Sequence, residues 1–186
     1  LGLSPKLCEV LDQLGFEQPT PIQEQAIPQL LSNNPTDFIG LAQTGTGKTA
    51  AFGLPLIDLI DLEDDSTQAI VMAPTRELGQ QTAKQLQSFV ANQRKLNVEV
   101  VYGGVDISKQ IRALKKPVQI VVATPGRLID LIERRAVSLD AVRYVVLDEA
   151  DEMLNMGFKE DIDRIISYTQ DDRSIWLFSA TMPQEI

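Results

Sequence analysis

Short runs of consecutive apolar residues alternate along the chain with longer segments of helix-like pattern. The runs predict six strands: Phe38–Ala42, Ala69–Ala73, Val98–Val101, Ile120–Ala123, Tyr144–Leu147 and Ser174–Phe178. Several are apolar at successive positions, which is typical of strands buried on both faces of a parallel sheet. The segments between them predict helices, among them Lys48–Leu62, Glu77–Gln93, Gly126–Arg135 and Lys159–Tyr168. Pro55 is expected to kink the first of these helices or to end a turn there.

This alternation of strand and helix predicts an α/β fold, a doubly wound and mainly parallel sheet with helices on both faces. Ahead of the first strand, residues 3–31 have a purely helical pattern, interrupted at Gly15 and at Pro19-Thr20-Pro21. We therefore expect one domain over residues 1–186, with a helical cap over residues 1–35 and an α/β core over residues 36–186. No apolar run has the ~20 residues that a membrane-spanning helix needs.

Composition limits the chemistry that the chain can perform. The 17 Lys and Arg residues against 26 Asp and Glu residues give a net charge of −9, which argues against a general polyanion binder but allows a local cationic groove. The single cysteine, Cys8, excludes a disulfide framework and favours the cytoplasm. Because there is no histidine, a His-bearing catalytic triad is excluded, and acid–base chemistry would have to use carboxylates or water.

A glycine-rich loop follows the first predicted strand and opens a helix. It consists of Ala42, Gln43, Thr44, Gly45, Thr46, Gly47, Lys48 and Thr49. Backbone N–H groups of such a loop close around phosphate oxygens, while the lysine reaches the β- and γ-phosphates and the Thr49 hydroxyl can bind Mg²⁺. A glycine-rich turn without a ligand is the alternative, which the Gly-Lys-Thr ending disfavours.

Acidic residues follow the fifth predicted strand, at Asp148-Glu149-Ala150-Asp151. In a nucleotide site, Asp148 would hold Mg²⁺, largely through water, and Glu149 would orient the attacking water. An acidic helix start explains the same residues, since Asp and Glu favour the first turn of a helix. The phosphate-type loop elsewhere in the chain favours the catalytic interpretation.

Polar clusters also follow the second, fourth and sixth strands, at Pro74–Glu77, Thr124–Arg127 and Ser179–Thr181. Each cluster alone is explained by helix capping. Because ligands bind at the carboxyl ends of strands in open α/β sheets, the clusters together favour a site there. Its two arginines and helix N-termini suit a sugar-phosphate backbone better than base edges.

Taken in their order along the chain, these motifs resemble those of DEAD-box ATP-dependent RNA helicases, and of bacterial members in particular. The matching segments are Gly15-Phe16 with Pro19–Gln23, then Ala42–Thr49, Pro74–Leu78, Gly103-Gly104, Thr124–Arg127, Asp148–Asp151 and Ser179–Thr181. They resemble the Q motif and motifs I, Ia, GG, Ib, II and III of that family. The resemblance implies the N-terminal RecA-like domain of a two-domain helicase that uses ATP and Mg²⁺.

The resemblance also implies roles for individual residues. Phe16 would stack on adenine, Gln23 would bond its N6 and N7 edge, and Gln18 would add a backbone contact. ATP would be bound by residues 42–49, with Lys48, Asp148 and Glu149 in catalysis. Asp151 would contact Ser179 and Thr181 and so couple the nucleotide and RNA states. RNA contacts would fall on Pro74, Thr75, Arg76, Gly103, Gly104, Thr124, Pro125, Gly126, Arg127 and Asp130.

The chain departs from the family pattern in two ways. The family's upstream aromatic, expected just before Leu1, is absent, and so is the second RecA-like domain that supplies arginine fingers. Such fingers are worth roughly 10³–10⁵ in rate, so we expect slow hydrolysis and no unwinding by this chain alone. A DNA helicase or translocase and a non-catalytic nucleotide-binding scaffold are the alternative functions.

Overall fold

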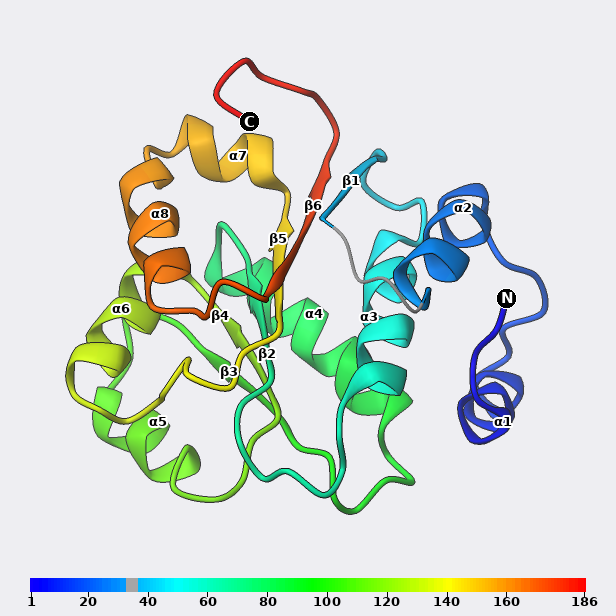
Figure 1. Cartoon of the computed structure of the whole chain (residues 1–186), viewed down its shortest axis with the longest axis horizontal. Helices are drawn as coiled ribbons and strands as arrows, with labels where there is room; N and C mark the ends of the chain where they lie inside the picture. Colours follow the sequence, from blue (N-terminus) through cyan, green and yellow to red (C-terminus); the bar gives the residue numbers. More distant parts are fainter. Residues whose placement is uncertain (33–36) are drawn as a thin grey trace.

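The computed structural model describes residues 1–32 and 37–186 (Figure 1). Within these residues a single six-stranded sheet has the order β1-β6-β5-β2-β4-β3, and all neighbouring strands are parallel. The strands are β1 (Phe38–Leu41), β2 (Ala69–Met72), β3 (Val98–Val101), β4 (Ile120–Ala123), β5 (Tyr144–Asp148) and β6 (Ser174–Ser179). The predicted parallel α/β sheet is confirmed.

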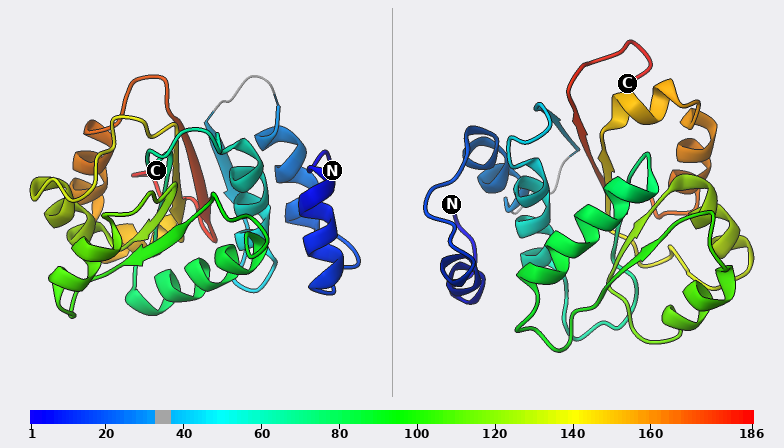
Figure 2. Two further views of the ribbon diagram at one scale, coloured as in Figure 1. Left: turned by 90° about the horizontal axis from the view of Figure 1, so that it is seen from below. Right: turned by 180° about the vertical axis from the view of Figure 1, so that it is seen from behind.

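Helices cover both faces of this sheet (Figure 2). One face carries α1 (Pro5–Gln13), α2 (Pro21–Leu30), α3 (Lys48–Leu59) and α4 (Arg76–Phe89). The other carries α5 (Ile107–Ala113), α6 (Pro125–Glu133), α7 (Ala150–Asn155) and α8 (Lys159–Ser167). The doubly wound arrangement is therefore also confirmed.

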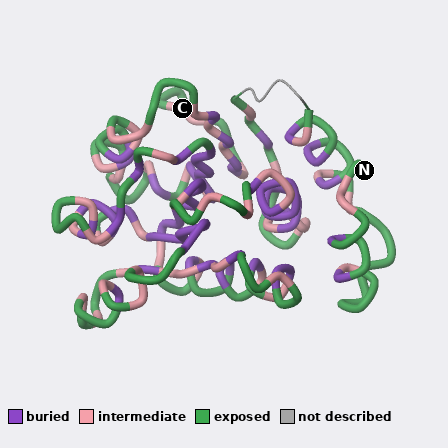
Figure 3. Tube along the Cα trace, turned by 60° about the horizontal axis from the view of Figure 1, so that its bottom comes forward, coloured by how far each residue is buried: buried purple, intermediate pink, exposed green. Residues whose placement is uncertain are grey.

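The central strands are apolar throughout because their side chains alternate between two hydrophobic cores. In β2, Val71 enters the core beneath α1 to α4, whereas Ile70 and Met72 enter the core beneath α6 to α8. Figure 3 shows these strands buried along their length, while the helices expose their outer sides. Burial on both faces explains why these runs show no alternation of apolar and polar residues.

The helix boundaries differ from the predicted ones, by one or two residues in α6 and α8 and by more in α3 and α4. Helix α3 continues through Pro55 to Leu59, so the proline does not end it, although the helix stops before Leu62. Helix α4 ends at Phe89 rather than Gln93. Helices α5 and α7 were not among the predicted segments, because seven and six residues hold too few turns for a helical period to stand out.

The N-terminal segment forms two helices separated by the turn at residues 14–20. The Ser4 hydroxyl accepts a hydrogen bond from the Leu7 amide at the start of α1. The same hydroxyl donates to Asp58 and so connects the start of α1 to α3. The expected boundary between residues 35 and 36 lies outside the described residues. None of the helices in residues 1–32 and 37–186 combines the length and apolar character that crossing a membrane requires.

Candidate functional site

The strand order divides the predicted site residues into two groups along the carboxyl edge of the sheet. Strands β1, β6 and β5 are neighbours, and the glycine-rich loop, Ser179 and Asp148 lie at their carboxyl ends. Strands β2, β4 and β3 are also neighbours, and they lead into the three segments predicted to contact RNA. One half of the edge therefore carries the predicted nucleotide residues and the other half the predicted RNA residues.

The glycine-rich loop turns sharply into α3 at Gly45 and Gly47, whose φ angles are +82° and +83°. Residues other than glycine rarely adopt this left-handed backbone conformation. At Gly47 there is also no space for a side chain, because a β carbon would lie 2.5 Å from Nε2 of Gln23. Because α3 begins directly after Gly47, its amino end, which carries the positive end of the helix dipole, faces the loop, an arrangement suited to phosphate.

Lys48, the first residue of α3, points at the acidic residues that end β5. Its Nζ atom lies 3.3 Å from Oε1 of Glu149 and 3.6 Å from Oδ1 of Asp148. Lys48 is only 6% exposed and Asp148 is fully buried. The predicted phosphate-binding cation and the predicted acidic pair, about a hundred residues apart in sequence, therefore meet in one charged cluster.

Asp148 carries an unusual proton affinity for a carboxyl group. Burial raises its pKa to about 6 despite the nearby Lys48 ammonium, and the Glu149 carboxylate contributes to the increase. Within the described residues, neither of its oxygens has a hydrogen-bond partner. A fully buried carboxylate with free lone pairs can accept hydrogen bonds from the water shell of a cation.

These residues fit Mg²⁺ rather than a metal held entirely by protein. The described residues contain no cluster of three or more His, Cys, Asp or Glu side chains that could hold an ion. Mg²⁺ is usually bound by one or two protein groups together with water and substrate phosphates. Asp148 and the partly buried Thr49 hydroxyl at the start of α3 are the groups available for such binding.

Glu149 is held in a backbone conformation that is costly for a side-chain-bearing residue. Its φ and ψ angles are 53° and 54°, and it forms the N-cap of α7. Its Oε1 atom accepts a bond from the Thr44 hydroxyl at 3.4 Å in addition to the Lys48 contact. Arg135 has a similar φ of 59° without a predicted role, so the conformation is compatible with the role of Glu149, which stays a prediction.

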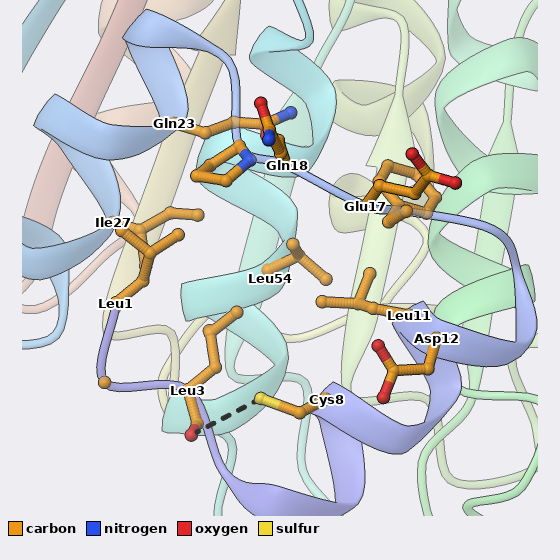
Figure 4. A pocket seen from close by; sticks show the side chains of 13 residues that line it. Leu1, Leu3, Cys8, Leu11, Asp12, Glu17, Gln18, Gln23, Ile27 and Leu54 are labelled. Carbon is orange, nitrogen blue, oxygen red and sulfur yellow. Dashed lines mark hydrogen bonds between the residues drawn. The ribbon is translucent and has the colours of Figure 1, made fainter.

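The predicted adenine residues line one apolar pocket of about 240 Å³ between α1, the turn after it, α2 and α3. In Figure 4, Gln18 and Gln23 lie at one end, Leu54 of α3 in the middle, and Cys8 near the backbone of Leu3 at the other end. Phe16 also lines this pocket. Its ring packs edge-on against Phe89 of α4, with a 5.9 Å centroid distance, and 37% of the residue is exposed.

Gln23 connects this pocket to the glycine-rich loop. Its Nε2 atom donates to the Gly47 carbonyl at 3.0 Å, and its Oε1 atom accepts from the Thr20 amide at 3.0 Å. Gln23 is only 5% exposed. The Gln23 side chain therefore ties Thr20, at the start of α2, to the glycine-rich loop.

Asp151 contacts both of the residues that were predicted to pair with it. Its Oδ2 atom accepts from the Thr181 hydroxyl at 3.0 Å and the Thr181 amide at 3.2 Å, and its own amide donates to Ser179 Oγ at 3.2 Å. Partial burial raises the pKa of Asp151, but the hydrogen bonds from Thr181 and Ser179 outweigh it and hold the pKa below its ordinary value. These bonds link α7 to the last residue of β6 and to the segment that follows it.

The segments predicted to contact RNA present helix starts and exposed glycines. Thr75 caps α4 by accepting the Leu78 amide at 3.2 Å, and Arg76 is exposed beside it. Pro125 is buried at the start of α6, where the Thr124 hydroxyl makes no capping bond. Asp130 pairs with Arg134 at 2.8 Å, as expected for residues four apart in a helix.

Gly103 and Gly126 are exposed, and their backbone does not require glycine. Neither has a φ in the left-handed region, and a β carbon at either position would meet no atom within 4 Å. Packing within the chain therefore gives no reason for a missing side chain. Glycine at these two positions would allow the backbone of a ligand to approach closely.

The residues that connect the RNA-predicted segments were not identified from the sequence. Tyr102 and Gln110 contact Arg76 and Arg127, respectively. The signal available for Tyr102 was its position directly before Gly103-Gly104. Gln110 stands at helical spacing from Ile107 and Leu114, which places it on the apolar side of this segment, but spacing does not identify its hydrogen-bond partners.

Comparison with known proteins gives one consistent family. The family model described as "DEAD/DEAH box helicase" matches residues 20–186. Over the whole chain, similar curated proteins include an ATP-dependent RNA helicase CshA of Limosilactobacillus reuteri, 56% identical, and an RNA helicase CrhR of Synechocystis, 54% identical. The chain spans about 37% of the length of each of these relatives.

Solved structures show the same relationship. A DEAD box protein from Methanococcus jannaschii superposes with a TM-score of 0.93 at 45% identity, over all of this chain and 50% of that one. The Saccharomyces cerevisiae dbp5 in a complex described as bound to nup159, gle1, ip6 and adp gives a TM-score of 0.89 at 37% identity. The alignment covers 98% of this chain and 48% of the yeast chain. The sheet described above is therefore the same fold as in these proteins.

Proposed function

This chain belongs to the DEAD/DEAH box helicase family, and we propose that it is the ATP- and RNA-binding N-terminal domain of an RNA-dependent ATPase. In the complete enzyme, hydrolysis of ATP would drive local separation of RNA duplexes. The proposal takes residues 1–186 as one RecA-like domain of a cytoplasmic protein. A second RecA-like domain would supply the arginine fingers and the other half of both sites.

The observation that carries this proposal is the meeting of Lys48 with Asp148 and Glu149. A lysine at a helix N-terminus after a glycine-rich loop, facing a buried aspartate and a partly exposed glutamate, is the arrangement that binding and cleaving a nucleoside triphosphate requires. The RNA-predicted segments occupy the neighbouring half of the same sheet edge. Coupling between the ATP-binding and RNA-binding residues would therefore act between neighbouring strands of one sheet.

In the proposed reaction, Lys48 and the amide groups at the start of α3 bind the β- and γ-phosphates. Thr49 and Asp148 would hold Mg²⁺, Asp148 largely through water. When bound, Mg²⁺ neutralises phosphate charge during phosphoryl transfer. Glu149 would polarise and orient the attacking water, which is the task left to a carboxylate in a chain without histidine.

We propose that the pocket beside Gln18 and Gln23 selects adenine and that Phe16 stacks on it. A site that hydrogen-bonds adenine leaves polar groups unpaired when guanine is present, so it discriminates against GTP. Asp151, Ser179 and Thr181 would couple the two halves of the edge. The RNA contacts would be to the sugar-phosphate backbone, with 2′-hydroxyls favouring RNA over DNA.

Two measurements test this proposal. Titration calorimetry of the chain with Mg²⁺ should show binding of ADP and ATP and weaker binding of GTP; absence of ATP binding would contradict it. In the complete protein, RNA should stimulate ATP hydrolysis more than DNA of the same sequence. Equal stimulation would favour a DNA translocase, and unchanged turnover in a Glu149→Gln variant would favour a non-catalytic scaffold.

A further inference from the structure

Tyr102 lies in the RNA-predicted half of the sheet edge, between the end of β3, the outermost strand of that half, and the glycine pair. The Arg76 guanidinium carbon lies 4.8 Å from the centre of its ring. Its hydroxyl accepts a bond from Gln80 Nε2 at 3.0 Å. Since Arg76 and Gln80 are four residues apart on α4, one helix face holds the ring at two points.

Gln110 of α5 reaches the same turn from the other side. Its Nε2 atom donates to the Tyr102 carbonyl at 3.1 Å, and its Oε1 atom accepts from Arg127 Nη1 at 2.9 Å. Gln110 is only 8% exposed. Both ends of this buried amide are therefore used, and losing one partner would leave a buried polar group unpaired.

Arg127 completes the enclosure of the glycine turn. Its Nη2 atom donates to the Val105 carbonyl at 3.0 Å. The carbonyls of residues 102 and 105 flank Gly103 and Gly104, so the turn is held at both ends by side chains from α5 and α6. Both terminal nitrogens of Arg127 make bonds inside the chain.

The two glycines of the turn contribute little to its order themselves. Gly103 and Gly104 are exposed, Gly104 has a φ of +82°, and neither would have a neighbour within 4 Å of a β carbon. Glycine loses more conformational entropy on ordering than any other residue. A ligand that binds the turn would bear this cost unless the protein orders the turn beforehand.

We propose that Tyr102, Gln110 and Arg127 are positioning residues for RNA, and that Arg127 acts by holding the Gly103-Gly104 turn rather than by touching RNA. This inference rests on the proposed RNA-binding function. The network Gln80–Tyr102–Gln110–Arg127, with Arg76 against the Tyr102 ring, joins the three RNA-predicted segments into one preformed surface. Its disruption should weaken RNA binding and leave nucleotide binding unchanged.

The test is a fluorescence anisotropy titration of the full chain with labelled single-stranded oligouridine at low salt. Gln110→Met keeps the size of the side chain but removes both bonds, and it should weaken RNA binding about tenfold. Tyr102→Phe keeps the ring beneath Arg76 and should cost less than Tyr102→Leu. Gln87→Met is the matched control, because Gln87 Nε2 bonds the Val98 carbonyl at the opposite end of β3.

A double-mutant cycle separates positioning from direct contact. If Arg127 acts through the turn, Arg127→Met combined with Gln110→Met should bind RNA no more weakly than the weaker single variant. Additive losses would show that Arg127 touches RNA and would overturn the inference.

Two further measurements distinguish failure of this inference from structural damage and from failure of the proposed RNA function. ADP affinity and urea unfolding of each variant should show that the nucleotide half remains folded; a parallel loss of ADP affinity would overturn the specific role. RNA affinity of Gln110→Met equal to wild type would contradict the inference alone. Absence of RNA binding by the wild-type chain would contradict the proposed RNA function and the inference with it.

Discussion

Nζ of Lys48 lies 3.3 Å from Oε1 of Glu149, and this contact joins the start of α3 to the residue after β5. Because Asp148 Oδ1 lies 3.6 Å from the same nitrogen, the Lys48 ammonium has two carboxylate partners. A bound triphosphate would compete with them for the ammonium. Nucleotide binding is therefore expected to break or lengthen these ion pairs.

Replacement of Lys48 by alanine should weaken ATP binding about 10- to 100-fold, since a charge-assisted hydrogen bond contributes about 1.5–3 kcal/mol. Titration calorimetry with Mg²⁺ measures this directly. Lys84→Ala, an exposed lysine on α4, is the control and should bind ATP like wild type. Unchanged ATP affinity in Lys48→Ala would contradict the assigned role.

Gln23→Ala should narrow the difference between ATP and GTP affinity. The substitution removes the predicted adenine contact together with the bonds to Thr20 and Gly47, so ATP affinity should fall more than GTP affinity. Gln25→Ala, at an exposed position on the same helix, serves as the comparison. An unaltered ratio of the two affinities would mean that adenine is recognised elsewhere.

The raised pKa of Asp148 predicts a pH dependence of stability. Between its ordinary pKa of 3.8 and about 6, the folded chain holds a proton that the unfolded chain lacks, so the free energy of unfolding falls as pH rises. The loss amounts to ~3 kcal/mol for a shift from 3.8 to about 6 and is complete above that pH. Asp148→Asn removes this contribution.

Urea unfolding without nucleotide or Mg²⁺ tests the Asp148 prediction. The asparagine has its own offset in stability, but that offset does not depend on pH. The stability of Asp148→Asn relative to wild type should therefore increase by ~2 kcal/mol between pH 4 and pH 7. A difference that stays constant over this range would contradict the raised pKa.

Gly126→Ala should separate stability from RNA binding. Gly126 is in the first turn of α6 with room for a methyl group, so alanine should raise the free energy of unfolding by about 0.5 kcal/mol. The same methyl group would stand where an RNA backbone is expected to approach, so RNA affinity should fall severalfold. A Gly126→Ala variant that is more stable and binds RNA with wild-type affinity would show that RNA binding does not require glycine at this position.

The strands and the nucleotide loop could be predicted because each is a local signal. Runs such as Ile120–Ala123 are apolar at every position, and the residues 42–49 have a characteristic spacing. The strand order could not be predicted, because periodicity does not say which strands are neighbours. The division of the edge into two halves follows from that order alone.

The contacts within the candidate site were partly foreseeable. The family resemblance indicated that Asp151 would meet Thr181, and the structure contains that bond. The bonds of Gln110 were not foreseeable, because its partners, the Tyr102 carbonyl and Arg127, come from other segments of the chain. The same holds for Phe16, whose edge-on contact with Phe89 depends on how α1 lies against α4.

Steady-state ATP hydrolysis by this chain with Mg²⁺, with and without single-stranded RNA, tests most directly whether the chain is one half of a two-part site. The account predicts very slow turnover in both conditions and RNA-stimulated turnover in the complete protein, because arginine fingers from a second domain contribute roughly 10³–10⁵ in rate. Robust RNA-stimulated turnover by the chain alone would contradict it, since the site would then be complete within residues 1–186.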